Sequence, residues 1–188
     1  MKVLKEIMTI SEGWLNKYLF HYIVDGKDYN YEVVSRNKIK DKDNLPISTN
    51  AVTIIPFTKD GKLIITKEFR YAVNDYVWEF PAGLIDEGET PIDSAIREMK
   101  EETGLDVIRI YQELPGAYSS VGMTDEKVAV VICKVDGVVK GSTGKEEIYV
   151  YKKSIKEVSE MIINNKLKVS GRMQLFLAGL NLGNIKID

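Results

Sequence analysis

Three glutamates near the middle of the chain, Glu98, Glu101 and Glu102, have the types and spacing of a cation site. They lie three and four residues apart, so a helix would place them on one face, where like charges repel. Glu101 and Glu102 also come just before Gly104, where the negative end of a helix dipole disfavours each carboxylate by about 0.3–1 kcal/mol. A hard cation would offset both effects, and carboxylates without His or Cys suit Mg²⁺ or Mn²⁺. The alternative is a charged face in solvent.

A helix over Pro91–Thr103 must position these glutamates. Thr90 can cap it, Pro91 suits its first turn, Asp93 can complete a capping box and Gly104 can end it. One stripe of the helix is apolar and should face a core, and it consists of Ile92, Ala95, Ile96 and Met99. The glutamates lie to one side of this stripe.

The segment around this helix resembles the Nudix box. It reads Gly83, five residues, Glu89, seven residues, then Arg-Glu-Met-Lys-Glu-Glu-Thr-Gly-Leu over 97–105, and every fixed position of the motif is matched. The resemblance implies the Nudix fold and a Mg²⁺-dependent hydrolase of nucleoside diphosphates linked to another moiety. It implies that the metal ligands are Glu98, Glu101, Glu102 and the backbone carbonyl of Ala82. It also implies that the loop–helix–loop is supported by Gly83, Glu89, Arg97 and Gly104.

Residues outside the box resemble the ADP-ribose pyrophosphatase branch of that family. The similar segments are Lys67–Val73, Trp78–Pro91 and the strand Tyr31–Arg36. This resemblance implies cleavage of ADP-ribose to AMP and ribose 5-phosphate by a homodimer whose partner's N-terminal part completes each active site. Two alternatives stay open: the same chemistry on another nucleotide sugar such as GDP-mannose, or a non-catalytic regulator that binds a nucleotide sugar. Degenerate box positions would favour the regulator, and none is seen.

Three flanking residues are candidates for binding substrate. Arg70 ends a strand close to the box, where a guanidinium could grip a diphosphate with two hydrogen bonds. Glu79 lies in a short, mostly apolar strand and could contact substrate or a metal ligand. Arg36, with Trp14, could contact the base or ribose. The alternatives are surface positions for Arg70 and Arg36, a strand-edge charge for Glu79 and core packing for Trp14.

The loop Pro115–Glu126 is long and polar, as loops that carry catalytic residues often are. Glu126 is the first candidate for activating water and Asp125 is the second. The alternative is a capped loop end that leads into the next strand. This loop departs from the sequences of the best-known members of the branch.

The remaining pattern predicts an α+β fold, an α/β/α sandwich around a mixed sheet. A hairpin is expected at 17–34 with its turn at Asp25–Asp28, and a polar linker at 37–49. Residues 1–45 would then form a small N-terminal β segment that serves dimerisation, and 46–188 the Nudix domain. Further strands are expected over 51–57, 62–69, 76–80, 107–114, 127–135 and 147–151, and helices after Ser154 and Ser170.

Composition excludes several other classes of protein. The 188 residues are 44% hydrophobic and 29% charged with a net charge of -2, which gives no support to nucleic-acid binding, and the apolar runs are too short to span a membrane. The single cysteine, Cys133, lies in an apolar run and should be a buried thiol. With no secretory signal at the N-terminus, this predicts a cytoplasmic protein. The single histidine, His21, excludes a His-rich zinc site and should be structural.

Overall fold

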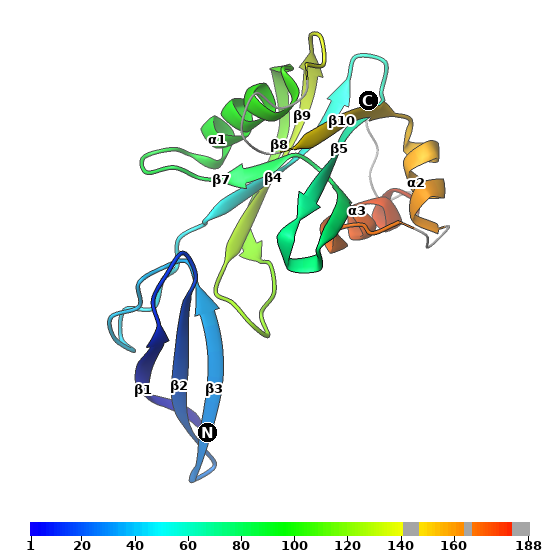
Figure 1. Ribbon diagram of the computed structural model, residues 1–188. Coiled ribbons are helices and arrows are strands. Elements are labelled where there is room, and N and C mark those ends of the chain that lie inside the picture. Colours follow the sequence, from blue (N-terminus) through cyan, green and yellow to red (C-terminus); the bar gives the residue numbers. More distant parts are fainter. Residues whose placement is uncertain (141–146, 164–166, 182–188) are drawn as a thin grey trace. The chain divides into compact units, whose positions relative to one another are not determined.

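The computed structural model describes residues 1–140, 147–163 and 167–181, and the chain forms two compact units (Figure 1). The first unit contains Met1–Ala51 and Pro115–Ala129, and the second contains Val52–Leu114 and Val130–Asp188. The sequence prediction placed a boundary near residue 45. That boundary stays a prediction. The first compact unit extends to Ala51 and also contains the loop that carries Glu126.

The first unit is built on an antiparallel sheet in the order β1 (Lys2–Ser11), β2 (Asn16–Val24) and β3 (Lys27–Ser35). The predicted hairpin is confirmed. Its two-residue turn places Asp25 and Gly26 at φ 50° and 80°, as the right-handed twist of paired strands favours. His21 hydrogen-bonds to Asp28 across this hairpin at 2.8 Å. The small core of the unit consists of Tyr18, Phe20 and Ile39.

The second unit is built on a mixed sheet in the order β10-β5-β4-β9-β8, with β6 beside β5 and β7 beside β4. Its strands are β4 (Ala51–Thr58), β5 (Leu63–Arg70), β6 (Asp75–Glu79), β7 (Ala82–Leu84), β8 (Asp106–Tyr118), β9 (Lys127–Asp136) and β10 (Ile148–Lys153). A 3-10 turn, η1 (Tyr71–Val73), joins β5 to β6. The strands were predicted to within a few residues, except β1 and the three-residue β7, which were missed.

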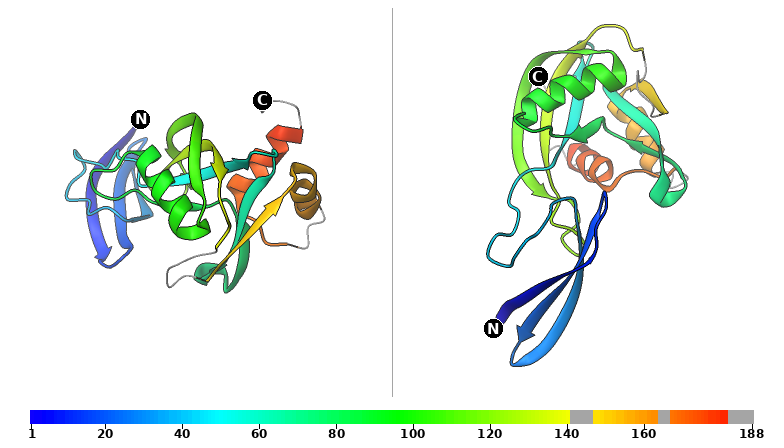
Figure 2. Two further views of the ribbon diagram at one scale, coloured as in Figure 1. Left: turned by 90° about the horizontal axis from the view of Figure 1, so that it is seen from above. Right: turned by 60° about the vertical axis from the view of Figure 1, so that its left-hand side comes forward.

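Helices cover both faces of the second sheet, which confirms the predicted sandwich. Figures 1 and 2 show α1 (Pro91–Glu98) on one side and α2 (Ile155–Ile163) and α3 (Gly171–Asn181) on the other. Residues 52–57 of β4 are therefore all buried, as expected of a strand covered on both faces. The core beneath α2 and α3 consists of Ile55, Phe57, Leu63, Ile65, Trp78, Phe80, Val158, Met173 and Leu177.

The lone cysteine lies in this second unit, on β9. Cys133 is fully buried, as predicted, and burial raises the pKa of its thiol to about 12. The helices in the described part of the chain are all too short or too polar to cross a bilayer.

Candidate metal and substrate site

The helix that carries the glutamates begins at Pro91 and ends before Gly104 as predicted, but its last turn is not α-helical. Thr90 Oγ1 accepts from Asp93 N at 3.2 Å and Asp93 Oδ2 accepts from Thr90 N at 3.1 Å, which completes the capping box. The α-helix stops at Glu98 and continues as a π-helical turn, η2 (Met99–Thr103), before Gly104 at φ 75°. The hydroxyl of Thr103 donates to Met99 O at 2.5 Å and so competes for the carbonyl that an α-helix would use. π-turns are frequent at functional sites.

The three glutamates on this turn have different surroundings. The side chain of Glu98 is 14% exposed and that of Glu101 is 57% exposed, while Glu102 is buried at 7%. Burial raises the pKa of Glu98 above its ordinary value, with like charge on Glu101 and Asp86 adding to it and Arg97 opposing it. A divalent cation would offset this cost of burying and crowding negative charge.

All these donors are carboxylate oxygens, which suits Mg²⁺ or Mn²⁺. Within 1–140, 147–163 and 167–181, however, no three His, Cys, Asp or Glu side chains converge closely enough to form a ready-made cation site. Glu98 already has a partner, because its Oε1 accepts from Arg97 Nη1 at 2.6 Å. Binding a cation there would require this carboxylate to exchange its partner.

Arg97 joins the loop before the helix to the helix itself. Its Nε and Nη2 both donate to the Glu89 carboxylate at 2.8 Å, and Nη2 also donates to Leu84 O at 2.9 Å. Its Nη1 reaches Glu98 at 2.6 Å and Glu101 at 3.5 Å. The hydrogen bonds to Arg97 lower the pKa of Glu89 to about 2. The glutamates, Glu89 foremost, raise the pKa of Arg97 above its ordinary value. These contacts tie the loop before the helix to the helix, and the supporting roles of Glu89 and Arg97 in metal binding stay a prediction.

Gly83 lies directly against the candidate metal ligand Glu98. A Cβ built on Gly83 would overlap the Glu98 carboxyl group. Gly83 belongs to β7, which the pairing with β4 holds in place, with Pro81 O accepting from Ile54 N at 2.8 Å. Gly83 cannot move away without breaking the pairing of β7 with β4, so an added Cβ would push the Glu98 side chain aside.

Replacing Gly83 by alanine should therefore displace the Glu98 carboxylate and raise the Mg²⁺ concentration needed for half-maximal activity by at least about tenfold, the range seen when support of a metal ligand is lost. The measurement is a Mg²⁺ titration of initial rates. Gly171→Ala is a matched control, because a Cβ there meets open space. Equal Mg²⁺ requirements in the two variants would contradict the assignment of Glu98 as a ligand.

A second cluster in the same unit surrounds Arg70 at the end of β5. Arg70 Nε donates to Glu79 Oε1 at 2.5 Å, and Arg70 Nη1 lies 2.8 Å from Glu68 Oε1. Burial would lower the pKa of Arg70, but Glu79, Glu68 and Glu102 together raise it. The structure thus brings two predicted substrate-binding residues, Arg70 and Glu79, into direct contact and within electrostatic reach of the candidate ligand Glu102.

The other predicted site residues belong to the first unit. Arg36 Nε donates to Glu126 Oε1 at 3.0 Å, and Ser119 Oγ donates to Glu126 Oε2 at 2.9 Å. The guanidinium of Arg36 stacks on Trp14, with 4.0 Å between its Cζ and the ring centroid, and Trp14 is 73% exposed. The predicted substrate residue and the predicted water-activating residue are therefore direct partners, although 90 positions separate them in the sequence.

Sequence reasoning missed two residues that contact the candidate site residues. Glu68 holds Arg70, and its alternation with Thr66 and Arg70 along β5 is the signal that it shares their face. Ser94 is fully buried, donates to Leu84 O at 3.0 Å and accepts from Arg97 at 3.2 Å. Its position three residues before Arg97 on the helix was the available signal.

Two hollows of the second unit differ in character. One, of about 580 Å³, is lined by residues that include Thr53, Phe80, Gln112, Arg172 and Phe176. Its lining comes from Phe80 and from residues of β4, β8, β9 and α3, so it lies on the face of the sheet that α3 covers.

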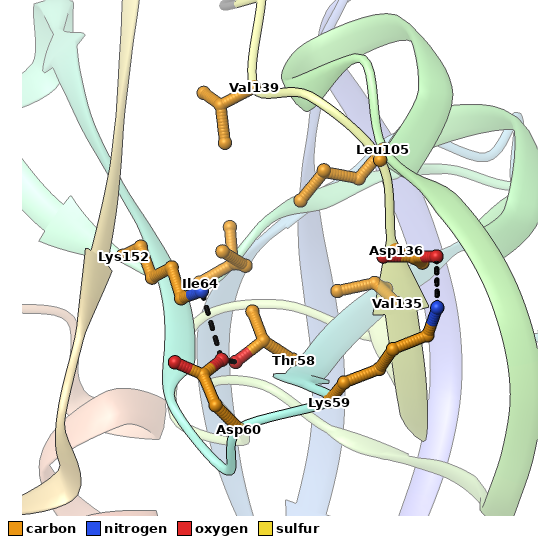
Figure 3. Close-up of a pocket in the computed structure, with 10 residues that line it drawn as sticks. Thr58, Lys59, Asp60, Ile64, Leu105, Val135, Asp136, Val139 and Lys152 are labelled. Carbon is orange, nitrogen blue, oxygen red and sulfur yellow. Dashed lines mark hydrogen bonds and ion pairs between the residues drawn. The ribbon is translucent and has the colours of Figure 1, made fainter.

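The other hollow, of about 100 Å³, lies at the β4–β5 turn and is lined in part by Leu105 and Val139 (Figure 3). Two of its lysines are paired, Lys152 with Asp60 at 2.9 Å and Lys59 with Asp136. Because these charges already have partners, we assign this hollow no chemical role.

Comparison with known proteins identifies relatives of this chain. A family model described as "NUDIX domain" matches residues 48–160. An ADP-ribose pyrophosphatase of Bacillus subtilis is 31% identical over 119 residues, which cover 63% of this chain and 61% of that protein. An ADP-sugar pyrophosphatase of Mus musculus is 38% identical over 101 residues, covering 50% of this chain and 44% of that protein. The chain thus spans less than two thirds of the length of these relatives.

A solved structure described as an ADP compounds hydrolase resembles the whole chain. The TM-score is 0.76 at 19% sequence identity, over 98% of this chain and 97% of that one. At this identity the likeness bears on the fold, and it agrees with the sandwich described above.

Proposed function

Because this chain belongs to the NUDIX domain family, we propose that it hydrolyses the diphosphate bond of a nucleoside diphosphate sugar, with ADP-ribose giving AMP and ribose 5-phosphate. The observation that carries the proposal is the arrangement of Glu98, Glu101 and Glu102 on one turn that Arg97 ties to the preceding loop. The names of the relatives, ADP-ribose pyrophosphatase and ADP-sugar pyrophosphatase, favour this class of substrate.

In this proposal the metal ion is Mg²⁺, or Mn²⁺ in its place. Glu98, Glu101, Glu102 and the Ala82 carbonyl would hold it, and when bound it neutralises charge on the phosphoryl oxygens and lowers the pKa of water. Burial of Glu102 and partial burial of Glu98 provide the strongly desolvated carboxylates that such a cation stabilises.

Residues of the chain would divide the remaining work. Arg70, oriented by Glu68 and Glu79, would bind the diphosphate through its guanidinium. Glu126 would accept the proton of the attacking water, and Arg36 with Trp14 would contact the base or ribose.

Exposed apolar side chains of the first unit support a proposed homodimer. Strand β1 and the turn that joins it to β2 expose several large apolar side chains, namely Val3, Met8, Ile10 and Leu15. Burying them against a second copy would stabilise both. Light scattering should give twice the 21.3 kDa mass of the chain.

A substrate panel at fixed Mg²⁺ tests the proposal. ADP-ribose, GDP-mannose and other nucleotide sugars would be incubated with the protein, and phosphate released by an added phosphatase would be measured. ADP-ribose should be turned over fastest. Faster release from GDP-mannose would move the assignment to another nucleotide sugar, and binding without release from any of them would identify a sensor instead of an enzyme.

A further inference from the structure

We propose that Asp125 is a positioning residue, clamped by the end of β3, that fixes the loop on which Glu126 acts. This inference rests on the proposed function insofar as Glu126 accepts a proton. All the contacts that carry it lie within the first unit, between the end of β3 with the two residues that follow and the loop 119–126.

The loop is attached to β3 at three consecutive residues, Gly122, Met123 and Thr124. Tyr31 Oη donates to Gly122 O at 2.7 Å, and Val34 N donates to Met123 O at 2.9 Å. Val34 also forms a parallel bridge with Thr124. The strand thus directs the path of the loop up to the residue before Asp125.

At Asp125 the loop is attached to the end of β3 and the residues after it through side-chain hydrogen bonds. Its Oδ2 accepts from Ser35 Oγ at 2.9 Å and from Asn37 Nδ2 at 3.2 Å. Ser35 is fully buried, and its Oγ also accepts from Asn37 N at 3.0 Å. Hydrogen bonds to a carboxylate are stronger than neutral ones, so these donors hold the backbone at Asp125 firmly.

The two carboxylates of the loop are therefore suited to different tasks. Asp125 Oδ1 is buried and has no hydrogen-bond partner among the residues that the structure describes, so it is closed to an incoming water. The neighbouring Glu126 is 19% exposed, with Arg36 and Ser119 each bonded to one of its oxygens. The geometry assigns anchoring to Asp125 and leaves proton transfer to Glu126. A catalytic base works only when neighbouring groups hold it in position, and Asp125 is the group that holds the loop of Glu126.

Asparagine and alanine at position 125 separate anchoring from proton transfer. The amide oxygen of asparagine can accept from both Ser35 and Asn37, whereas alanine leaves both donors without their acceptor. An asparagine cannot take a proton from water. If Asp125 accepted the proton, both variants would lose that function. If Asp125 anchors the loop, only the alanine variant loses the anchor.

The experiment compares Asp125→Asn, Asp125→Ala and Ser35→Ala in the full chain with Mg²⁺ and ADP-ribose. We expect Asp125→Asn to keep kcat within about threefold of the unaltered protein, and Asp125→Ala to lower kcat at least about thirtyfold with KM changed less than about threefold. Ser35→Ala, which removes one of the two donors, should fall between them. Asp43→Ala is the control, since Asp43 is an exposed aspartate of the same unit, paired with Lys42.

Two results would overturn the inference: equal loss of kcat in Asp125→Asn and Asp125→Ala, or unchanged kcat in Asp125→Ala. Hydrogen exchange of the amides at 119–126, measured by mass spectrometry, tests the clamp without turnover. Exchange should accelerate at least about tenfold in Asp125→Ala and stay unchanged in Asp125→Asn. If the unaltered protein cleaves no nucleotide sugar, the proposed function fails while this exchange pattern still decides the clamp.

Discussion

Replacing Glu98 by glutamine should lower kcat/KM for ADP-ribose at least about 100-fold at saturating Mg²⁺. The substitution keeps the size of a side chain that is 14% exposed and removes its charge. A metal ion supplies several kcal/mol of charge stabilisation in the transition state. Losing about 2.7 kcal/mol of this stabilisation lowers kcat/KM about 100-fold. Initial rates of AMP formation over a range of Mg²⁺ and ADP-ribose concentrations measure the effect.

Glu113→Gln is the matched control for this variant. Glu113 is an exposed glutamate on β8, so the same chemical change there should leave kcat/KM within about twofold. Mg²⁺-dependent turnover that is unchanged in Glu98→Gln would show that Glu98 does not bind the metal, and the assignment of the whole turn would fall with it.

Replacing Arg97 by lysine should raise the Mg²⁺ concentration for half-maximal activity by about 10–100-fold, although the charge is kept. Arg97 contacts both oxygens of Glu89, the Glu98 carboxylate and Leu84 O at once. A lysine ammonium is a single point of contact and cannot reproduce this planar fork. The loop carrying Gly83 and the turn carrying Glu98 would then lose their common support. Mg²⁺ titrations of initial rates give the shift.

Arg109→Lys serves as the control, because Arg109 is exposed on β8 and stacks on Tyr111. Its Mg²⁺ requirement should equal that of the unaltered protein. If Arg97→Lys behaved like this control, the contacts of Arg97 would have no part in preparing the metal ligands.

The parts of the site that sequence reasoning placed well are local. Thr90, Asp93 and Gly104 specify where the helix begins and ends, and spacings of three and four residues place Glu98, Glu101 and Glu102 on the last turn of this helix, although in the part of the chain that the structure describes their carboxylates do not converge into a ready-made cation site. The π-turn was not predicted, because the apolar pattern of the helix runs through Met99 without a break and nothing in it indicates that the backbone pairing changes after Glu98.

The parts that sequence reasoning could not place depend on pairing between distant segments. Arg36 and Glu126 meet because β3 and the loop 119–126 lie side by side, and no periodicity in either segment specifies its partner. β7 was missed because three residues after a proline carry too short a pattern to indicate a strand. β1 was missed although it pairs with β2 over most of its length, with two register shifts that break the alternation.

The most direct test of the central claim is a phosphorus NMR time course of ADP-ribose with the protein, first with Mg²⁺ and then with excess EDTA. The two diphosphate resonances should be replaced by those of AMP and ribose 5-phosphate in equal amounts when Mg²⁺ is present, and should persist with EDTA. Diphosphate resonances that persist in both samples, or that disappear equally in both, would contradict metal-dependent hydrolysis at the Glu98–Glu102 turn.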